Sequence, residues 1–134
     1  MNPYVDTGVY TEASVLTASP GRLIVMLYDG AIRFLSQGAI AMRAGHRERM
    51  RDRLGRAEAI LDELNVILDL RQGEIPAQLR SLYTFCKREL QRASIKDEPE
   101  RLDRIVRLLA ELREGWEEIA DRQEHELLAP EEVA

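Results

Sequence analysis

The fold of this chain is decided by residues 50–68, MRDRLGRAEAILDELNVIL, in which apolar side chains recur at alternating intervals of four and three residues. The members of the series are Met50, Leu54, Ala57, Leu61, Leu64 and Leu68. Because an α-helix turns about once every 3.6 residues, this spacing gathers the side chains into the a/d stripe of antiparallel helix packing. The stretch predicts a helix from about Arg47 to Leu70, with Gly73 ending it.

Terminal residues mark a helix that precedes this one. Ser19 and Pro20 open it, because a serine hydroxyl accepts a hydrogen bond from the first turn and proline suits the first helical position. We expect it to run from Pro20 to about Arg43, with Gly45 placed to end it. Within it, Gly38 permits close approach of a neighbouring helix.

The second half of the chain contains two more helical patterns. One begins near Pro76 and carries apolar side chains at helical spacing as far as Ala93. The other opens at Asp97, which we expect to cap the helix while Glu100 reaches back, and Pro99 fits the first turn. Connections of about three to six residues favour antiparallel neighbours. The sequence therefore predicts an all-α fold, an antiparallel up-down four-helix bundle.

A segment of different character precedes the bundle. Pro3 and Gly8 interrupt any periodicity in residues 1–18, for which we expect an extended or short-helical N-terminal arm. The arm carries enough apolar side chains to cover a groove as a displaceable lid. We assign residues 19–123 to the four-helix bundle and residues 124–134 to a flexible acidic C-terminal tail.

The composition limits the class of protein. The chain has 134 residues, 45% of them hydrophobic and 32% charged, with a formal net charge of −5. This length suits one domain with its own core, and the apolar share is too large for a disordered chain. The sequence lacks a run of about 18 apolar residues, so we expect no membrane insertion. Residues 1–8 lack the pattern of a secretory signal, so we expect an intracellular protein.

Candidate catalytic and metal-binding residues are few. His46 and His125 fall at a turn and in the predicted tail, where we expect solvated surface side chains. The single cysteine, Cys86, lies on an apolar stripe, which favours a buried, inert thiol over a nucleophile. We therefore expect no enzyme, no metal and no cofactor, and the rival hypothesis is a bundle enzyme with a metal or thiol centre.

A basic stretch stands out at residues 47–56. It holds five arginines, interleaved with Glu48 and Asp52. Binding to nucleic acid would require such a patch to dominate the field around the chain, whereas the net charge is −5. We interpret the stretch as a solvated face, with docking of a protein partner as the alternative, and we expect no nucleic-acid partner.

Apolar side chains exceed what one inward stripe per helix requires. Ile60 and Ile67 repeat beside the main stripe of residues 50–68, and Tyr83 and Val106 add to the surplus in the later helices. Two interpretations stay open. The helices share a wide core face, or the surplus lines a groove that receives apolar helices from a partner.

The N-terminal part of the sequence resembles a known family. It contains Tyr10 and Val15, then TASP at residues 17–20 and LIVMLYDGAIRFL at residues 23–35. Later matches are Ala57, Ile60, Glu63, Leu64, Leu79, Leu82, Tyr83, Leu90, Ala93, Leu112, Arg113 and Trp116. On these residues the chain resembles the FliS family, the flagellar secretion chaperones. One departure is Gly115, where the family commonly has alanine before the tryptophan.

The resemblance implies a non-enzymatic, cytoplasmic chaperone for the export of flagellin. Such a protein binds the disordered C-terminal segment of flagellin, which folds into helices in apolar grooves, and so prevents premature polymerisation. It also delivers its client to an export-gate component of the flagellar type III secretion apparatus, and the arm tyrosine that matches Tyr10 is implicated in that docking. Coupled folding and binding requires a large apolar interface to offset the ordering of the client.

These implications, joined to the surplus apolar stripes, define the predicted site. We assign Tyr10 and Val15 to the arm, and Ser19 and Pro20 to the start of the first helix. The predicted groove residues are Ile24, Leu27, Tyr28, Ile60, Leu64, Ile67, Leu79, Tyr83 and Val106. The chain could be a monomer or an arm-swapped homodimer, and a generic helical adaptor with another protein client is the alternative function.

Overall fold

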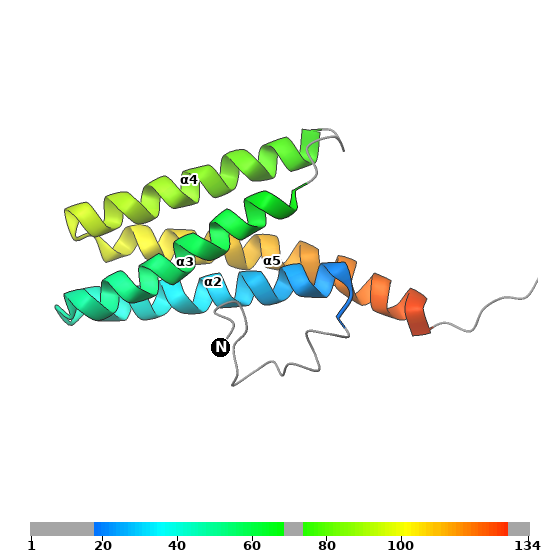
Figure 1. The fold of residues 1–134 in the computed structure, drawn as a ribbon, viewed down its shortest axis with the longest axis horizontal. Coiled ribbons are helices and arrows are strands. Elements are labelled where there is room, and N and C mark those ends of the chain that lie inside the picture. The colour runs from blue at the N-terminus through cyan, green and yellow to red at the C-terminus, as the bar shows by residue number, and fades with distance from the viewer. Residues whose placement is uncertain (1–17, 69–73, 129–134) are drawn as a thin grey trace, which may run out of the picture.

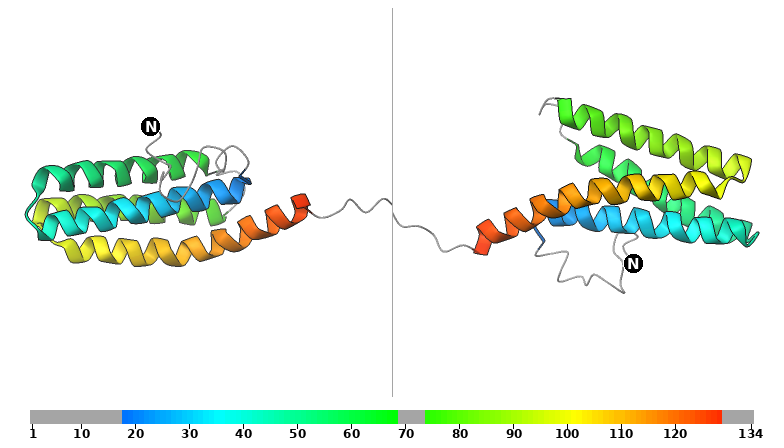
Figure 2. Two further views of the ribbon diagram at one scale, coloured as in Figure 1. Left: turned by 90° about the horizontal axis from the view of Figure 1, so that it is seen from below. Right: turned by 180° about the vertical axis from the view of Figure 1, so that it is seen from behind.

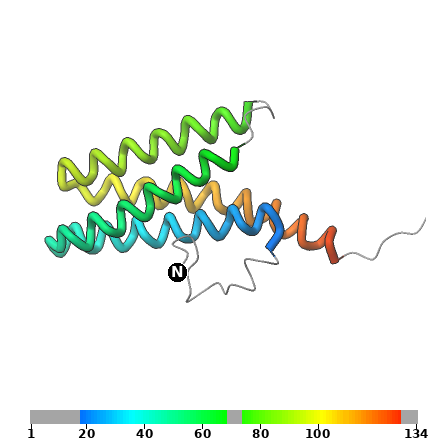
Figure 3. The backbone as a smooth tube through the Cα atoms, in the orientation of Figure 1, coloured from blue at the N-terminus to red at the C-terminus, as the bar shows by residue number. Residues whose placement is uncertain are grey.

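The computed structural model describes residues 18–68 and 74–128, which form four helices. They are α2 (Pro20–Arg43), α3 (Arg47–Ile67), α4 (Glu74–Lys96) and α5 (Pro99–Leu128). Successive helices run in opposite directions, as the chain path in Figure 3 shows. In Figure 1, α4 lies on the opposite side of the bundle from α2, with α3 and α5 between them. The predicted all-α bundle is confirmed.

The ends of α2 follow from local chemistry. The Ser19 hydroxyl accepts a hydrogen bond of 3.2 Å from the backbone N–H of Arg22, and Pro20 occupies the first turn, as predicted. At the other end Gly45 adopts a φ of +76°, which glycine tolerates because it has no Cβ. The N–H of His46 then donates to the carbonyl of Ala41 at 2.9 Å, which closes the helix.

The turn between α4 and α5 differs from the prediction. Asp97 has a φ of +57°, and the N–H of Glu98 donates to the carbonyl of Ala93 at 3.0 Å. This arrangement is the same type of closing turn that Gly45 makes, so Asp97 ends α4 and does not cap α5. Aspartate is one of the few residues other than glycine that adopt this left-handed conformation readily.

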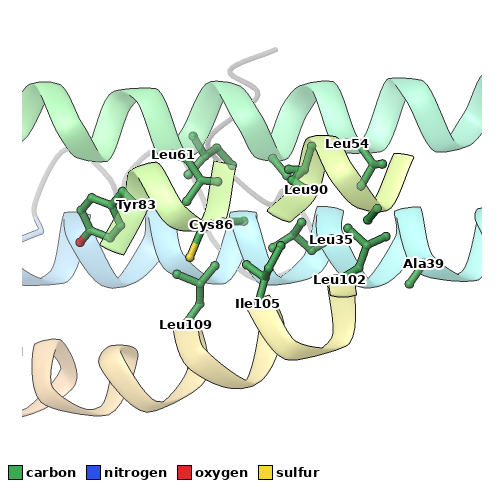
Figure 4. Close-up of a cluster of buried hydrophobic side chains, with 14 of the residues drawn as sticks. Leu35, Ala39, Leu54, Leu61, Tyr83, Cys86, Leu90, Leu102, Ile105 and Leu109 are labelled. Carbon is green, nitrogen blue, oxygen red and sulfur yellow. The ribbon is translucent and has the colours of Figure 1, made fainter. Parts of the chain in front are cut away.

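The stripe of residues 50–68 packs into the core as predicted. Met50, Leu54, Leu61 and Leu64 are buried, and only Leu68, at the end of α3, is half-buried. Figure 4 shows side chains of α2, α3, α4 and α5 meeting in one interior. The largest fully buried side chains include Tyr28, Tyr83, Leu35, Ile60, Leu61, Leu102, Ile105 and Leu109. These buried stripes account for the apolar face of each helix.

Two glycine-bearing contacts bring helices close together. A Cβ at Gly38 would lie 2.5 Å from Cδ2 of Leu54, so this glycine admits α3 against α2 as predicted. A Cβ at Gly21 would lie 3.1 Å from the backbone of Ala120, so the start of α2 lies directly on α5.

Helix α5 is longer than the predicted bundle segment. It continues to Leu128, so the part of the predicted tail at residues 124–128 is helical. Ala120 is the last buried residue of α5, and the end of the helix extends beyond the other helices, as the two views of Figure 2 show. The N-terminal arm up to residue 17 and the tail from residue 129 lie outside the described residues.

By length and composition, α2 is the one helix of the described part of the chain that could cross a membrane. Half of its apolar window is buried against the other helices. Its buried side chains, among them Val25, Tyr28 and Leu35, belong to the interior of the bundle. The high hydropathy of α2 is therefore accounted for by packing.

Candidate functional site

An apolar pocket of about 170 Å³ opens where α3 ends and α4 begins. Its lining residues are Ile24, Leu64, Ile67, Leu68, Ile75, Pro76, Leu79, Tyr83 and Trp116. All four described helices, or the residues that directly follow them, contribute to this lining. Because the lining is almost entirely aliphatic and aromatic, the pocket suits an apolar side chain from a partner.

Five of the nine predicted groove residues meet in this pocket. They are Ile24 from α2, Leu64 and Ile67 from α3, and Leu79 and Tyr83 from α4. Ile67 is 45% exposed, whereas Leu64 and Tyr83 are buried beneath the opening.

Four predicted groove residues do not line the pocket. Leu27, Tyr28 and Ile60 are buried in the core cluster, because they lie nearer the middle of the bundle, where the neighbouring helices cover their side chains. Val106 is half-buried and packs against the same core. Tyr10 and Val15 lie outside the described residues.

The prediction missed four lining residues, namely Leu68, Ile75, Pro76 and Trp116. Ile75 and Pro76 begin α4, and an isoleucine in an exposed first turn is a signal that sequence reasoning could have used. Trp116 was named among the residues that carry the family resemblance and was not assigned to the groove. It is only half-buried, because the bundle opens at this level.

Paired hydroxyl groups lie beneath the pocket. The side chains of Tyr28 and Tyr83 hydrogen-bond through their hydroxyl oxygens, and their rings meet edge to face with centroids 6.2 Å apart. Burial raises the pKa of both tyrosines. The two phenols therefore stay neutral and partnered, so the base of the pocket presents no free charge.

Ion pairs fix α2 against α5 beside this end of the bundle. Arg22 bonds to Glu117 at 2.5 Å, to Asp121 at 2.9 Å and to Glu124 at 2.9 Å. The N–H of Gly21 donates to the Gln123 side chain at 2.8 Å. These contacts hold the two helices that carry Ile24 and Trp116 in a fixed relation, which keeps that side of the pocket in place.

The thiol and imidazole groups do not form a reactive centre among the described residues. Cys86 is fully buried, as predicted, and burial raises the pKa of its thiol to about 11. His46 and His125 are exposed, also as predicted. Within residues 18–68 and 74–128, histidine, cysteine and carboxylate side chains do not gather in a group of three or more that could hold a metal ion.

The basic stretch of α3 is a solvent-facing surface. Arg53 bonds to Asp52 at 2.7 Å, and Arg56 bonds to the same carboxylate at 3.2 Å. Arg56 also lies over the ring of Phe34, 5.8 Å from its centroid. Arg47 is exposed. The interleaved carboxylate offsets part of the positive charge, in keeping with a solvated face.

Comparison with known proteins identifies the family of this chain. A family model described as "Flagellar protein FliS" matches residues 1–123. The chain belongs to the FliS family. The match covers the arm, α2, α3, α4 and α5 as far as residue 123, so the resemblance carried by TASP at residues 17–20 and by residues 23–35 is confirmed.

Curated relatives of this FliS-family chain are flagellar secretion chaperones. The "Flagellar secretion chaperone FliS" of Bacillus subtilis is 33% identical over 117 residues, covering 87% of this chain and 85% of the relative. That of Vibrio cholerae is 32% identical over 124 residues, covering 92% and 90%. "Flagellar secretion chaperone FliSB" of Pseudomonas aeruginosa is 34% identical over 116 residues, covering 84% and 90%. Chaperone is a non-enzymatic role.

Proposed function

We propose that this FliS-family chain is a cytoplasmic export chaperone for flagellin. It binds the disordered C-terminal segment of flagellin, prevents premature polymerisation and assists delivery to a component of the flagellar export gate. The observation that carries the proposal is the apolar pocket at the open end of the bundle, lined from four helices and rimmed by the exposed Ile67. The names of the relatives supply the flagellar context.

The pocket suits one anchor side chain of a client helix. Ordering a disordered segment costs about 1–2 kcal/mol per residue in backbone entropy. Burying apolar surface returns about 25 cal/mol per Å², so a client must cover much more than this pocket. A wrapping segment does so by placing apolar side chains at helical spacing along the bundle, one of them between Ile67 and Leu79.

Calorimetry with a peptide of the flagellin C-terminus tests the proposal. We expect binding with a strongly negative heat-capacity change, because apolar surface is buried on association. Ile67→Glu should weaken binding about tenfold or more, since a carboxylate would be desolvated in an apolar pocket. Helicity should be unchanged, because Ile67 is 45% exposed.

Val66→Glu provides the matched control. Val66 adjoins Ile67 and is 77% exposed but does not line the pocket, so its substitution should leave affinity unchanged. Equal loss in both variants would contradict the pocket as the binding site. If the flagellin peptide does not bind while another protein client does, the generic helical adaptor is the function.

The arm has two roles in this proposal. Residues 1–18 act as a displaceable lid over the apolar surface, and Tyr10 contacts the export gate. Val15→Asp should loosen the lid and so strengthen client binding. Tyr10→Ala should lower export of flagellin without changing its affinity for the chaperone. A loss of client affinity in the Tyr10 variant would contradict the separation of roles.

A further inference from the structure

A second surface lies on the outer face of α4, apart from the pocket described above. It is formed by Ala77, Arg80, Ser81, Thr84, Phe85 and Arg88, all of them residues of α4. It shares no lining residue with the apolar pocket. Phe85 is 52% exposed, which is unusual for the ring of a phenylalanine.

The chemistry of this α4 surface is apolar and positively charged. The hydroxyls of Ser81 and Thr84 donate to the carbonyls of Ala77 and Arg80, at 3.2 Å and 2.9 Å, so both hydroxyl protons are already used within the helix.

The charge on the α4 surface is not neutralised within the described chain. Arg80 and Arg88 are exposed and form no ion pair with any described residue. The neighbouring cations are paired, because Lys87 bonds to Asp62 at 2.8 Å and Arg92 bonds to Glu89 at 3.1 Å. An acidic segment with large apolar side chains complements such a surface.

The end of α5 has this complementary chemistry. Leu127 and Leu128 are 74% and 84% exposed, beyond the last buried residue of the helix, and Glu126 precedes them. The sequence then adds Glu131 and Glu132, with no lysine or arginine after Arg122. In Figures 1 and 2 the end of α5 points away from α4 of its own chain and past the end of the bundle.

We propose that the acidic, leucine-bearing end of α5 in one copy docks on the α4 surface of a second copy. Leu127 and Leu128 cover Phe85, and the carboxylates that follow approach Arg80 and Arg88. Because each chain carries both partners of the contact, two copies can exchange it reciprocally and close as a two-fold dimer. The contact is small and partly ionic, so the dimer is weak, concentration-dependent and sensitive to salt.

Sedimentation equilibrium of the full chain at low and high salt tests this proposal. We expect a monomer–dimer equilibrium that shifts toward monomer as salt rises. The double variant Arg80→Glu/Arg88→Glu should weaken dimerisation about tenfold or more, since attraction is replaced by repulsion. The matched control is Arg47→Glu/Arg51→Glu, which makes the same charge change at exposed residues of α3 and should leave dimerisation unaltered.

Reversing the charges of both surfaces, in two separate chains that are then mixed, tests whether these surfaces contact each other. A chain carrying Glu126→Lys, Glu131→Lys and Glu132→Lys should also be monomeric. Mixing it with the Arg80→Glu/Arg88→Glu chain should restore association, because each reversed surface then meets its opposite. A wild-type chain that stays monomeric at all concentrations would overturn the inference and leave the α4 surface to an acidic segment of another protein. A dimer that the α4 variants do not affect would also overturn it, in favour of an arm-swapped dimer.

Discussion

At the scale of single residues, the hydrogen bond between the hydroxyl groups of Tyr28 and Tyr83 links the pocket to the core. Tyr83→Phe removes this hydrogen-bond partner from the fully buried Tyr28 side chain. We expect the free energy of unfolding to fall by about 1–3 kcal/mol, because a buried polar group loses a partner that water cannot replace.

The double variant Tyr28→Phe/Tyr83→Phe is the comparison that isolates this pair. It removes both hydroxyl groups, so its cost should be smaller than the sum of the two single costs. Urea unfolding followed by circular dichroism measures all three variants. Strict additivity would show that the two hydroxyl groups do not stabilise each other.

At the scale of helices, the contact between the start of α2 and the end of α5 depends on a small residue. In Gly21→Ala the new Cβ would meet the backbone of Ala120 at 3.1 Å, so the two helices must separate and stability should fall. Gly115→Ala meets nothing within 4 Å and should raise stability by about 0.5–1 kcal/mol, because alanine is the better helix former. Thermal unfolding of the two variants, which carry the same chemical change, should show shifts of opposite sign.

The ion pairs of Arg22 make the same helix contact dependent on pH. The hydrogen bond from Arg22 lowers the pKa of Glu124, so this carboxylate stabilises the folded state above its ordinary pKa of 4.5. That contribution is lost as pH falls through and below this value, where the native carboxylate takes up a proton.

Arg22→Gln should therefore lower the melting temperature more at pH 7 than at pH 3. The control is Arg104→Gln, at an exposed arginine of α5, which should change neither value. A difference between wild type and Arg22→Gln that is the same at both pH values would assign the effect of Arg22 to packing of its side chain instead of its charge.

The sequence predicted a helix end correctly where the residue type at that end favours a single backbone role. Ser19, Pro20 and Gly45 fixed both ends of α2 because each acts within a turn of its own position. Asp97 was assigned wrongly because aspartate serves both as a cap and as a left-handed residue, and only the packing of α4 against α5 selects between them. The length of α5 was underestimated although the first residue that stops a helix, Pro130, comes after Leu128.

The candidate site was only half predictable for a physical reason. Ile24 and Tyr28 share one face of α2, and Ile60 and Ile67 share one face of α3, yet one member of each pair lines the pocket and the other is buried in the core. The spacing of apolar residues predicts which face of a helix is buried, but not how far along the bundle a residue lies. The pocket residues differ from the core residues in that position. The level at which the four helices diverge is set by their packing and cannot be read from the spacing.

At the scale of the whole molecule, the two surfaces use different residues of the same stretch of α4. The apolar pocket is built from four helices and lies where they diverge, whereas the α4 surface belongs to one helix and faces outward. A client in the pocket therefore does not have to displace a second copy on α4. Variants of Arg80 and Arg88 should leave affinity for the client unchanged, and variants of Ile67 should leave dimerisation unchanged.

Trp116 provides a signal that distinguishes these two events. It is the only tryptophan in the chain, lines the pocket and is half-buried, so a client helix that enters the pocket must cover it. We expect its fluorescence emission to move to shorter wavelength when the flagellin C-terminal segment is added, because water is displaced from the indole. Ile67→Glu should require about tenfold or more client for the same shift, whereas Val66→Glu should match wild type. Dimerisation through α4 should leave the emission unchanged, since Trp116 is not among the residues of the α4 surface. A client that binds with full affinity and does not alter the emission would contradict the placement of its anchor side chain beside Trp116.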